Sequence, residues 1–224
     1  MLIDGPTLPL ERKKRQRLKH EALPSYPQSV SARIEAQPRT DEWVWLQRAV
    51  FVLVRPRDVF RAMRDDSDAA ARVRSEAVLA LVLLSGVAGV LWTSNYGHLL
   101  DDVANDAVNV AVIAFIGGSL YGTAVYFVGG LVLYALARVV GGLTYRQVRH
   151  VLAFASAPVA LSLFCVFPVR LAVYGEDIFR GGGADHGAGN TAFYVIELAF
   201  VLWALVLLAV GLSTVRGQPG LERR

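Results

Sequence analysis

A single acidic residue, Glu197, lies inside a long apolar run of the sequence, TAFYVIELAF. An ionised carboxylate is costly in hydrocarbon, so a carboxylate at such a place is a candidate for moving a proton or an ion across a membrane. The sequence is equally compatible with a Glu197 that reaches the outer surface of the membrane or that pairs with Arg170. A transport pathway usually shows more than one polar group at depth, which counts against this role; Glu197 is the one candidate ion or proton site in the sequence.

Three residues of the segment TSNYGHLLDDVANDA have types that bind metals. His98, Asp101 and Asp102 stand at positions i, i+3 and i+4 and would share one face of a helix. Zinc normally needs three or four well-placed ligands, and an exposed acidic turn is also an ordinary solvated surface. We therefore predict no metal site and no cofactor.

Motifs of catalysis are absent from the sequence. It contains no GxSxG, no HExxH and no paired-aspartate motif of an intramembrane protease, and no serine or cysteine has a histidine at credible reach. The glycine-rich stretch EDIFRGGGADHGAG lacks the Lys-Ser/Thr that ends a phosphate-binding loop, so we expect a flexible linker. We predict that the protein is not an enzyme.

The elements around these residues are indicated by the composition. The chain has 224 residues, of which 54% are hydrophobic and only 19% charged, which is too apolar for an ordinary soluble domain. Asp, Glu, Lys and Arg are absent from four stretches, each about long enough to cross roughly 30 Å of hydrocarbon as a helix. These stretches are residues 77–100, 107–137, 151–169 and 198–215. The fold predicted is an all-α bundle of four transmembrane helices.

The basic residues indicate the orientation of these spans. Of the 23 Lys and Arg residues, 21 lie before the first span, between the second and third, or after the last. The positive-inside rule then places both termini in the cytoplasm. The basic run from Arg12 to Lys19 has the charge to bind nucleic acid, but it has no interleaved aromatics, and we expect it to contact anionic lipid.

Four regions follow from this pattern. Residues 1–40 predict a disordered basic tail, and residues 41–74 an amphipathic segment at the membrane surface, with Trp43 and Trp45 at headgroup depth. Within it, RPRDVFRAM suits a short amphipathic helix that starts at proline. Residues 75–216 form the transmembrane domain, and residues 217–224 a cytoplasmic tail.

Glycine and proline mark irregular points of the spans. The uncharged stretch 107–137 is long for one helix, and we favour a break at Gly117-Gly118 over a single tilted helix. Pro158 predicts a kink in the third span. Small residues that let helices approach closely also recur, either for packing within the chain or for a homo-oligomer. They are Ser85, Gly89, Gly118, Gly122 and Gly129.

The turn between the second and third spans, GGLTYRQ, is one of four segments that resemble a known family. Together with RPRDVFRAM, the run AFASAP and the end of the last span, LWALVLLAVGLSTVRG, it resembles the bacterial branch of the Yip family of Ypt-interacting membrane proteins. The resemblance covers roughly residues 45–217. It implies an integral membrane protein, and family members commonly have five spans. Eukaryotic relatives associate with small Ras-like GTPases, but resemblance to the bacterial branch implies no such partner.

We therefore predict a non-enzymatic scaffold or adaptor of the plasma membrane, without nucleic acid. It would present residues 45–64 and the turn residues Tyr145, Arg146 and Arg149 to anionic lipid, to another membrane protein or to a second copy of the chain. The alternative is a small transporter or channel subunit that uses Glu197 and the broken second helix. Inverted repeats usually accompany broken helices in transporters, and we find none.

Overall fold

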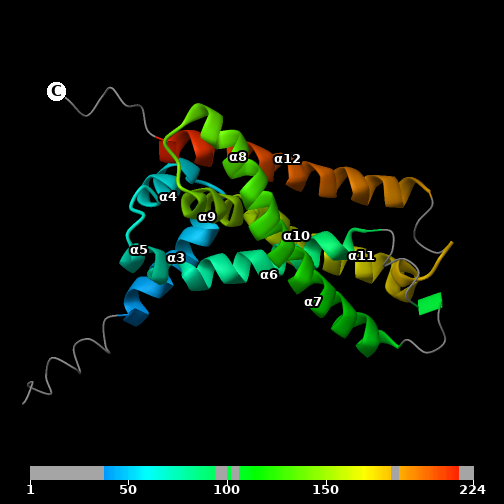
Figure 1. Cartoon of the computed structure of the whole chain (residues 1–224). Helices are drawn as coiled ribbons and strands as arrows, with labels where there is room; N and C mark the ends of the chain where they lie inside the picture. The colour runs from blue at the N-terminus through cyan, green and yellow to red at the C-terminus, as the bar shows by residue number, and fades with distance from the viewer. Residues whose placement is uncertain (1–37, 94–99, 102–105, 183–186, 217–224) are drawn as a thin grey trace, which may run out of the picture. The chain divides into compact units, whose positions relative to one another are not determined.

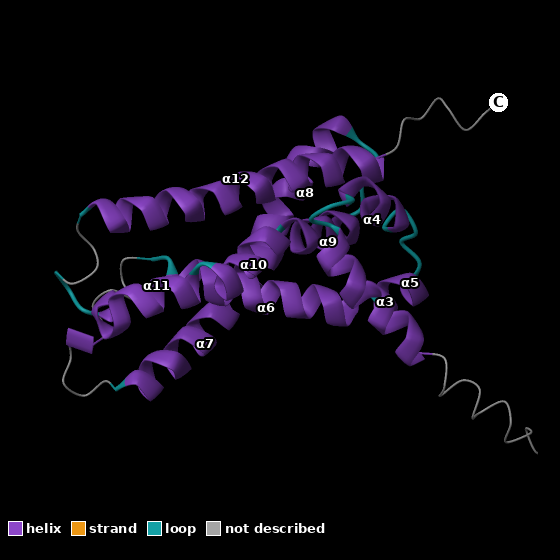
Figure 2. Ribbon diagram, turned by 180° about the vertical axis from the view of Figure 1, so that it is seen from behind, coloured by secondary structure: helices purple, strands orange, loops and turns teal. Residues whose placement is uncertain are grey.

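A computed structural model describes residues 38–93, 100–101, 106–182 and 187–216, and in these ranges the chain is helical and contains no strand. The described residues from Thr40 onward belong to one compact unit. Its elements are the helices α3 (Pro38–Phe51), α4 (Pro56–Ala62), α5 (Asp68–Val73), α6 (Ser75–Leu91), α7 (Ala107–Ala124), the π-helix η2 (Val125–Gly129), α8 (Gly130–Val140), α9 (Tyr145–Ala155), α10 (Ala157–Cys165), α11 (Phe167–Tyr174), the 3₁₀-helix η3 (Gly175–Phe179) and α12 (Ala188–Arg216) (Figures 1 and 2). The predicted tail 1–40 lies almost wholly outside the described residues.

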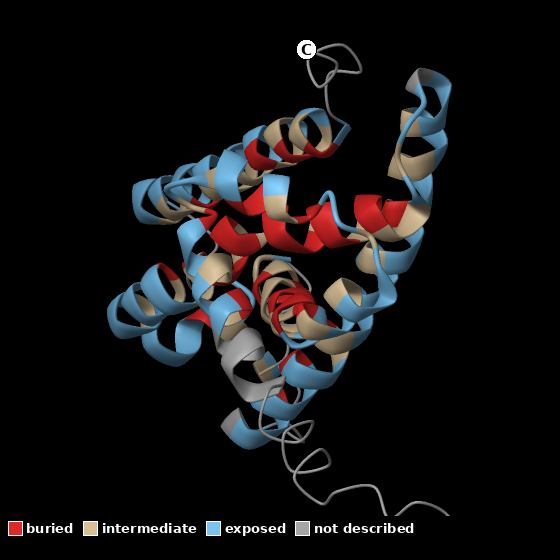
Figure 3. Ribbon diagram, turned by 90° about the vertical axis from the view of Figure 1, so that its left-hand side faces the viewer, coloured by how far each residue is buried: buried red, intermediate tan, exposed pale blue. Residues whose placement is uncertain are grey.

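Three helical stretches of the described chain are long and apolar enough to cross a membrane, namely Val108–Val139, Tyr145–Phe179 and Ala188–Arg216. The first predicted span corresponds to α6, which is apolar but has only 17 residues. Large apolar side chains remain exposed along α7, α8 and α12, for example Leu120 at 67% and Leu136 at 64%. An apolar surface of this kind is typical of a protein in contact with lipid. Figure 3 shows the buried residues gathered where the helices meet.

The break predicted at Gly117-Gly118 is wrong. α7 passes through both glycines as regular α-helix, and the irregular segment is η2, about two turns further along the chain. A π-helix keeps the chain helical but changes its hydrogen-bonding pattern from i→i+4 to i→i+5. The second span is therefore one continuous helical stretch with a local change of pitch at Val125–Gly129.

Small residues allow α6 and α7 to pack closely. A methyl group added at Gly86 would lie 2.7 Å from the Cα of Gly122, and one added at Gly118 would lie 2.5 Å from the Cα of Val87. Gly89 faces the ring of Tyr121, at 3.0 Å from the position of an added methyl group. In lipid, close backbone approach of this kind replaces the hydrophobic effect as the source of helix association.

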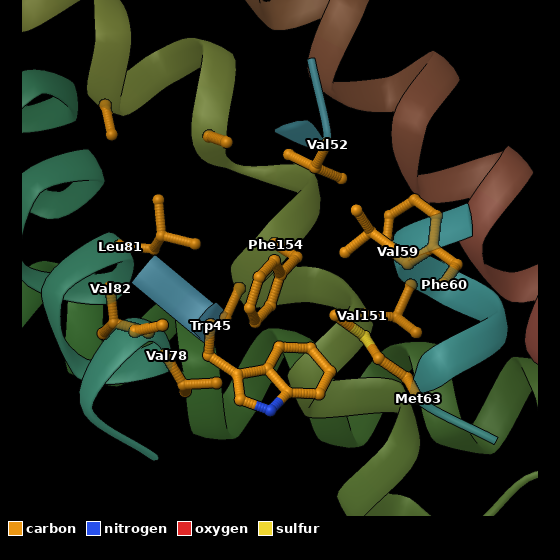
Figure 4. Close-up of a cluster of buried hydrophobic side chains, with 14 of the residues drawn as sticks. Trp45, Val52, Val59, Phe60, Met63, Val78, Leu81, Val82, Val151 and Phe154 are labelled. Carbon is orange, nitrogen blue, oxygen red and sulfur yellow. The ribbon is translucent and has the colours of Figure 1, made fainter. Parts of the chain in front are cut away.

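The segment before the first span packs on the helices. Val59, Phe60 and Met63 are all at most 4% exposed, so protein covers the apolar side of α4. Figure 4 shows these side chains in one cluster with the rings of Trp45 and Phe154, whose centroids are 5.7 Å apart. This cluster attaches α3 and α4 to α6, α9 and α12.

The third predicted span contains two interruptions. α9 ends at Ala155, Ser156 lies between the helices, and buried Pro158 stands in the first turn of α10. α11 begins in the same way, with Pro168 in its first turn. Proline suits these places because its missing N–H would be unpaired in a first turn anyway.

Candidate functional site

The start of α9 is held by side chains of the GGLTYRQ turn. The Thr144 hydroxyl accepts a hydrogen bond from the Gln147 N–H at 3.1 Å, and the Gln147 side-chain oxygen accepts one from the Thr144 N–H at 3.0 Å. This reciprocal capping box pairs two amides that would otherwise be unsatisfied. The same two side chains reach the segment between α4 and α5: Thr144 donates to Asp66 Oδ2 at 2.7 Å, and Gln147 Nε2 donates to the Arg64 carbonyl oxygen at 3.3 Å.

Arg146 fastens the same segment with its guanidinium. Its Nε donates to Asp66 Oδ1 at 2.8 Å, and its terminal nitrogens donate to the Asp66 carbonyl oxygen and to the Asp68 carboxylate. The Asp66 side chain is 19% exposed, whereas that of Asp68 is 85% exposed. The hydrogen bond from Arg146 holds the pKa of the Asp68 carboxyl below its usual range.

Arg74 lies beneath this arrangement and is fully buried. Its Nε donates to His150 Nδ1 at 3.0 Å, and one terminal nitrogen donates to the Asp65 carbonyl oxygen at 2.9 Å and lies 3.8 Å from Asp66 Oδ1. An arginine N–H can only donate, so Nδ1 of His150 carries no proton. Burial lowers the pKa of the Arg74 guanidinium, and the charge of Asp66 acts in the opposite direction.

Asp66 thus lies between two arginines, Arg74 from the start of α6 and Arg146 from the start of α9. The hydrogen-bonded pair with Arg146 is a strong, directional link, and Arg74 adds charge attraction at 3.8 Å. We call the side chains of Arg74, His150, Asp66, Arg146 and Thr144 the Asp66 network. Its geometry suits the fixing of the α4–α5 segment to the bundle.

Arg149 has different surroundings. Its guanidinium carbon lies 4.4 Å from the ring centroid of Tyr145, 4.9 Å from that of Phe127 and 5.1 Å from that of Tyr126. The Tyr145 hydroxyl donates to the Phe127 carbonyl oxygen, which belongs to the π-helix, at 2.9 Å. A methyl group at Gly130 would lie 2.5 Å from the Arg149 Cγ, so glycine leaves room for this side chain. Three aromatic rings therefore hold the guanidinium by cation–π contacts.

Glu197, the candidate ion or proton site, pairs with Arg170. The Arg170 Nη1 lies 3.2 Å from Glu197 Oε1, and its Nη2 donates to the Asn190 side-chain oxygen at 3.1 Å. The Glu197 side chain is 8% exposed and that of Arg170 16%. The sequence is compatible with three roles for Glu197: an ion or proton site, a position at the membrane surface, or an ion pair with Arg170. In the structure Glu197 forms the ion pair, which links α11 to α12.

Other predicted residues lie apart from these groups. Trp45, for which a lipid or partner contact is predicted, is a core residue at 6% exposure. The same prediction for Trp43 falls outside the described residues, because the structure does not describe its side chain. His98 and Asp102 of the metal candidate are also outside them, and Asp101 accepts hydrogen bonds from the Gly181 N–H. In the described ranges no three His, Cys, Asp or Glu side chains are grouped to hold a metal ion.

Comparison with known proteins identifies the family. The family described as Yip1 domain matches residues 50–223, which is most of the chain and includes every residue of the Asp66 network. The chain belongs to the Yip1 domain family. No curated protein and no solved structure gives a match.

In this Yip1 domain the polar residues of the GGLTYRQ turn bind the chain's own α4–α5 segment, and sequence reasoning missed their partners. Asp66 and Arg74 are distant from the turn in sequence, with Asp66 80 residues from Arg146, and His150, one helical turn beyond Arg146 on α9, was not recognised as their partner. One signal was present: the acidic pair Asp65-Asp66 interrupts an otherwise arginine-rich stretch. Opposite charges attract each other, so a basic turn and an acidic pair that lie on the same side of a membrane can form ion pairs.

Thr144→Ala is expected to lower the free energy of unfolding by about 1–2 kcal/mol, because it removes an N-cap and leaves one oxygen of Asp66 without its donor. Thr144→Ser keeps the hydroxyl and is the matched control, with an expected change below about 0.5 kcal/mol. Denaturant unfolding of the purified protein in detergent measures both. Equal losses in the two variants would contradict the capping role.

Proposed function

We propose that this Yip1 domain is a non-enzymatic membrane scaffold whose arginine-rich end faces the cytoplasm and presents α4 and α5 to a partner. The observation that carries the proposal is the Asp66 network. It uses the polar side chains of the turn to fix the α4–α5 segment in place, and α4 packs against α12, with Phe60 beside Gly211. A segment held so firmly at the end of a bundle is suited to presenting its outer face.

The outer face of this end is basic. Exposed arginines lie on α4, α5 and the ends of α8 and α12, and they are Arg55, Arg57, Arg61, Arg64, Arg72, Arg138 and Arg216. Arg64 donates to the Thr214 carbonyl oxygen, and Gly142 lies near the Arg216 side chain, so these elements meet at one end. The positive-inside rule supports a cytoplasmic position for that end.

Four spans remain the proposed topology. α6 has 17 residues and a length of about 25 Å, which suffices with modest thinning of the bilayer. It packs along α7 through Gly86 and Gly118, and α7 is part of a helical stretch that is long enough to span. A plasma-membrane location with both termini in the cytoplasm is part of the same proposal.

The test compares partner capture by the full chain and by two surface variants in mild detergent. Arg57→Ala/Arg61→Ala removes two exposed charges of α4 and leaves the Asp66 network intact, and Arg61 has only Asp58 as an ion-pair partner among the described residues. Glu176→Ala/Arg180→Ala changes an exposed pair in η3 and is the control. We expect a stoichiometric protein partner that binds roughly tenfold more weakly to the α4 variant alone.

Recovery of only the protein and its lipids, unchanged in all three samples, would contradict the scaffold function. Transport by way of Glu197 would then be the next function to test. The Arg170–Glu197 ion pair supplies a structural reason for that carboxylate, so transport requires that Glu197→Gln abolish solute flux in vesicles while the protein stays folded.

A further inference from the structure

A cavity of about 330 Å³ lies between α6, α7, α9, α10 and α12. Its lining is largely apolar and includes Val82, Trp92, Tyr121, Leu152 and Val159. Along α6 the lining extends from Val82 to Trp92, a distance of about 15 Å in the direction of the helix axis. The cavity is therefore elongated along the helices that cross the membrane.

The two serines of the lining donate hydrogen bonds to backbone carbonyl oxygens nearby in the chain. The hydroxyl of Ser85 donates to the Val82 carbonyl oxygen at 3.3 Å, and that of Ser156 donates to the Ala153 carbonyl oxygen at 2.8 Å. Their remaining surface in the cavity offers little to a polar ligand. Apolar cavities of this kind take up hydrocarbon in preference to water.

One end of the cavity adjoins Arg149. Tyr126 lines the cavity, and its ring also contacts the Arg149 guanidinium; Leu152, one turn beyond Arg149 on α9, lines the cavity as well. The Arg149 Nε is buried and has no hydrogen-bond partner. Among the described residues no carboxylate forms an ion pair with Arg149, whereas Arg74, Arg146 and Arg170 each have one within 4.0 Å. An anion from outside the chain could therefore pair with this guanidinium without displacing a carboxylate of the protein.

The depth of Arg149 fits a lipid headgroup. Arg149 stands in the second turn of α9, just after the turn that joins the second and third spans. Tyr126, Phe127 and Tyr145 surround its guanidinium, and aromatic residues of this kind are enriched where the membrane meets water. The cavity runs from Tyr126 along α6 to Trp92.

We propose that Arg149 and this cavity form a binding site for one anionic phospholipid. The phosphate pairs with the Arg149 guanidinium, and an acyl chain enters the cavity beside Tyr126. The aromatic rings orient the guanidinium, and the Tyr145 hydrogen bond to the π-helix fixes them. The site rests on the position of the helices in the membrane and does not depend on the proposed partner surface of α4.

Trp92 allows a direct test, because it lines the cavity and its fluorescence is quenched by brominated acyl chains. The full chain is placed in phosphatidylcholine vesicles that contain a minor fraction of brominated phosphatidylglycerol, or the same fraction of brominated phosphatidylcholine. The quenching that disappears in Trp92→Phe reports the cavity. We expect the anionic lipid to bind there about fivefold more tightly than the zwitterionic one.

Arg149→Gln is expected to abolish this preference, and Arg149→Lys to keep part of it. Ser85→Leu fills the cavity without touching Arg149 and should remove the Trp92 quenching, so the site stays testable if Arg149→Gln fails to fold. Equal quenching by the two lipids in the parent protein would overturn the proposal, as would an unchanged preference in a folded Arg149→Gln. Loss of the preference on adding inorganic phosphate would assign the arginine to free phosphate and overturn the lipid site. The partner-capture test on α4 is unaffected by any of these results.

Discussion

Gly122→Ala is expected to separate α6 from α7 and to lower the free energy of unfolding by about 3 kcal/mol, the upper part of the range for overpacking. The added methyl group would overlap the Val82 carbonyl oxygen and would lie 3.0 Å from the Cα of Gly86. Both are backbone atoms of α6, so no change of side-chain rotamer relieves the clash. The two helices must move apart, and their other close contacts weaken together.

Gly129→Ala is the matched control for this prediction. The same substitution, later in the same helical stretch, places a methyl group 3.6 Å from a side-chain atom of Val125 and 3.7 Å from one of Leu152. These are ordinary contacts, and alanine favours a helix over glycine by about 1 kcal/mol, so no loss of stability is expected. Thermal unfolding in detergent measures both variants. Similar losses at the two glycines would contradict a special role for Gly122.

Features that depend on local sequence could be predicted. The absence of charge over 107–137, 151–169 and 198–215 is enough to locate three long apolar helices, because hydropathy acts residue by residue. The apolar side of RPRDVFRAM was recognised from its spacing, and these residues are buried. The spacing of these residues does not show what covers the apolar side of α4. The sequence analysis predicts the membrane surface, whereas in the structure other helices of the protein cover it.

The position of the helix irregularity could not be predicted for a related reason. The length of the uncharged stretch 107–137 predicts a break, which the sequence analysis places at Gly117-Gly118. In the protein, Gly118 is instead the place where α7 approaches α6, and the π-helix begins at Val125, where the sequence shows no breaker. The role of a glycine in a span depends on which other helix it contacts, and this contact joins residues that are far apart in the sequence.

Part of the candidate site can be predicted from the sequence. The sequence identifies Tyr145, Arg146 and Arg149 as one group, but in the structure the two arginines have different partners. Arg146 is engaged by Asp66 and Asp68 within the chain, whereas Arg149 is surrounded by aromatic rings, one of them from Phe127 of the π-helix. Only three-dimensional neighbours distinguish two arginines that stand so close together on one helix.

Asp66→Asn is expected to lower the free energy of unfolding by about 3 kcal/mol or more, because it removes the carboxylate that two guanidiniums share. Arg74 has no exposed surface, and its Nη1 already lacks a hydrogen-bond partner, so its charge cannot turn to water. The neutral amide also weakens the hydrogen bonds from Arg146 and Thr144. Denaturant unfolding in detergent measures the change.

Asp68→Asn makes the same chemical change at the exposed carboxylate that Arg146 also contacts. The Asp68 side chain is 85% exposed and pairs with Arg146 alone among the arginines described, so a much smaller loss than for Asp66→Asn is expected. Arg74→Met in the Asp66→Asn background should recover part of the stability, since it removes the charge that has lost its partner. Equal losses for the two asparagine variants, or no recovery in the double variant, would show that the buried charge of Arg74 does not depend on Asp66. The α4–α5 segment would then be held chiefly by its apolar side, and its orientation would not depend on the turn.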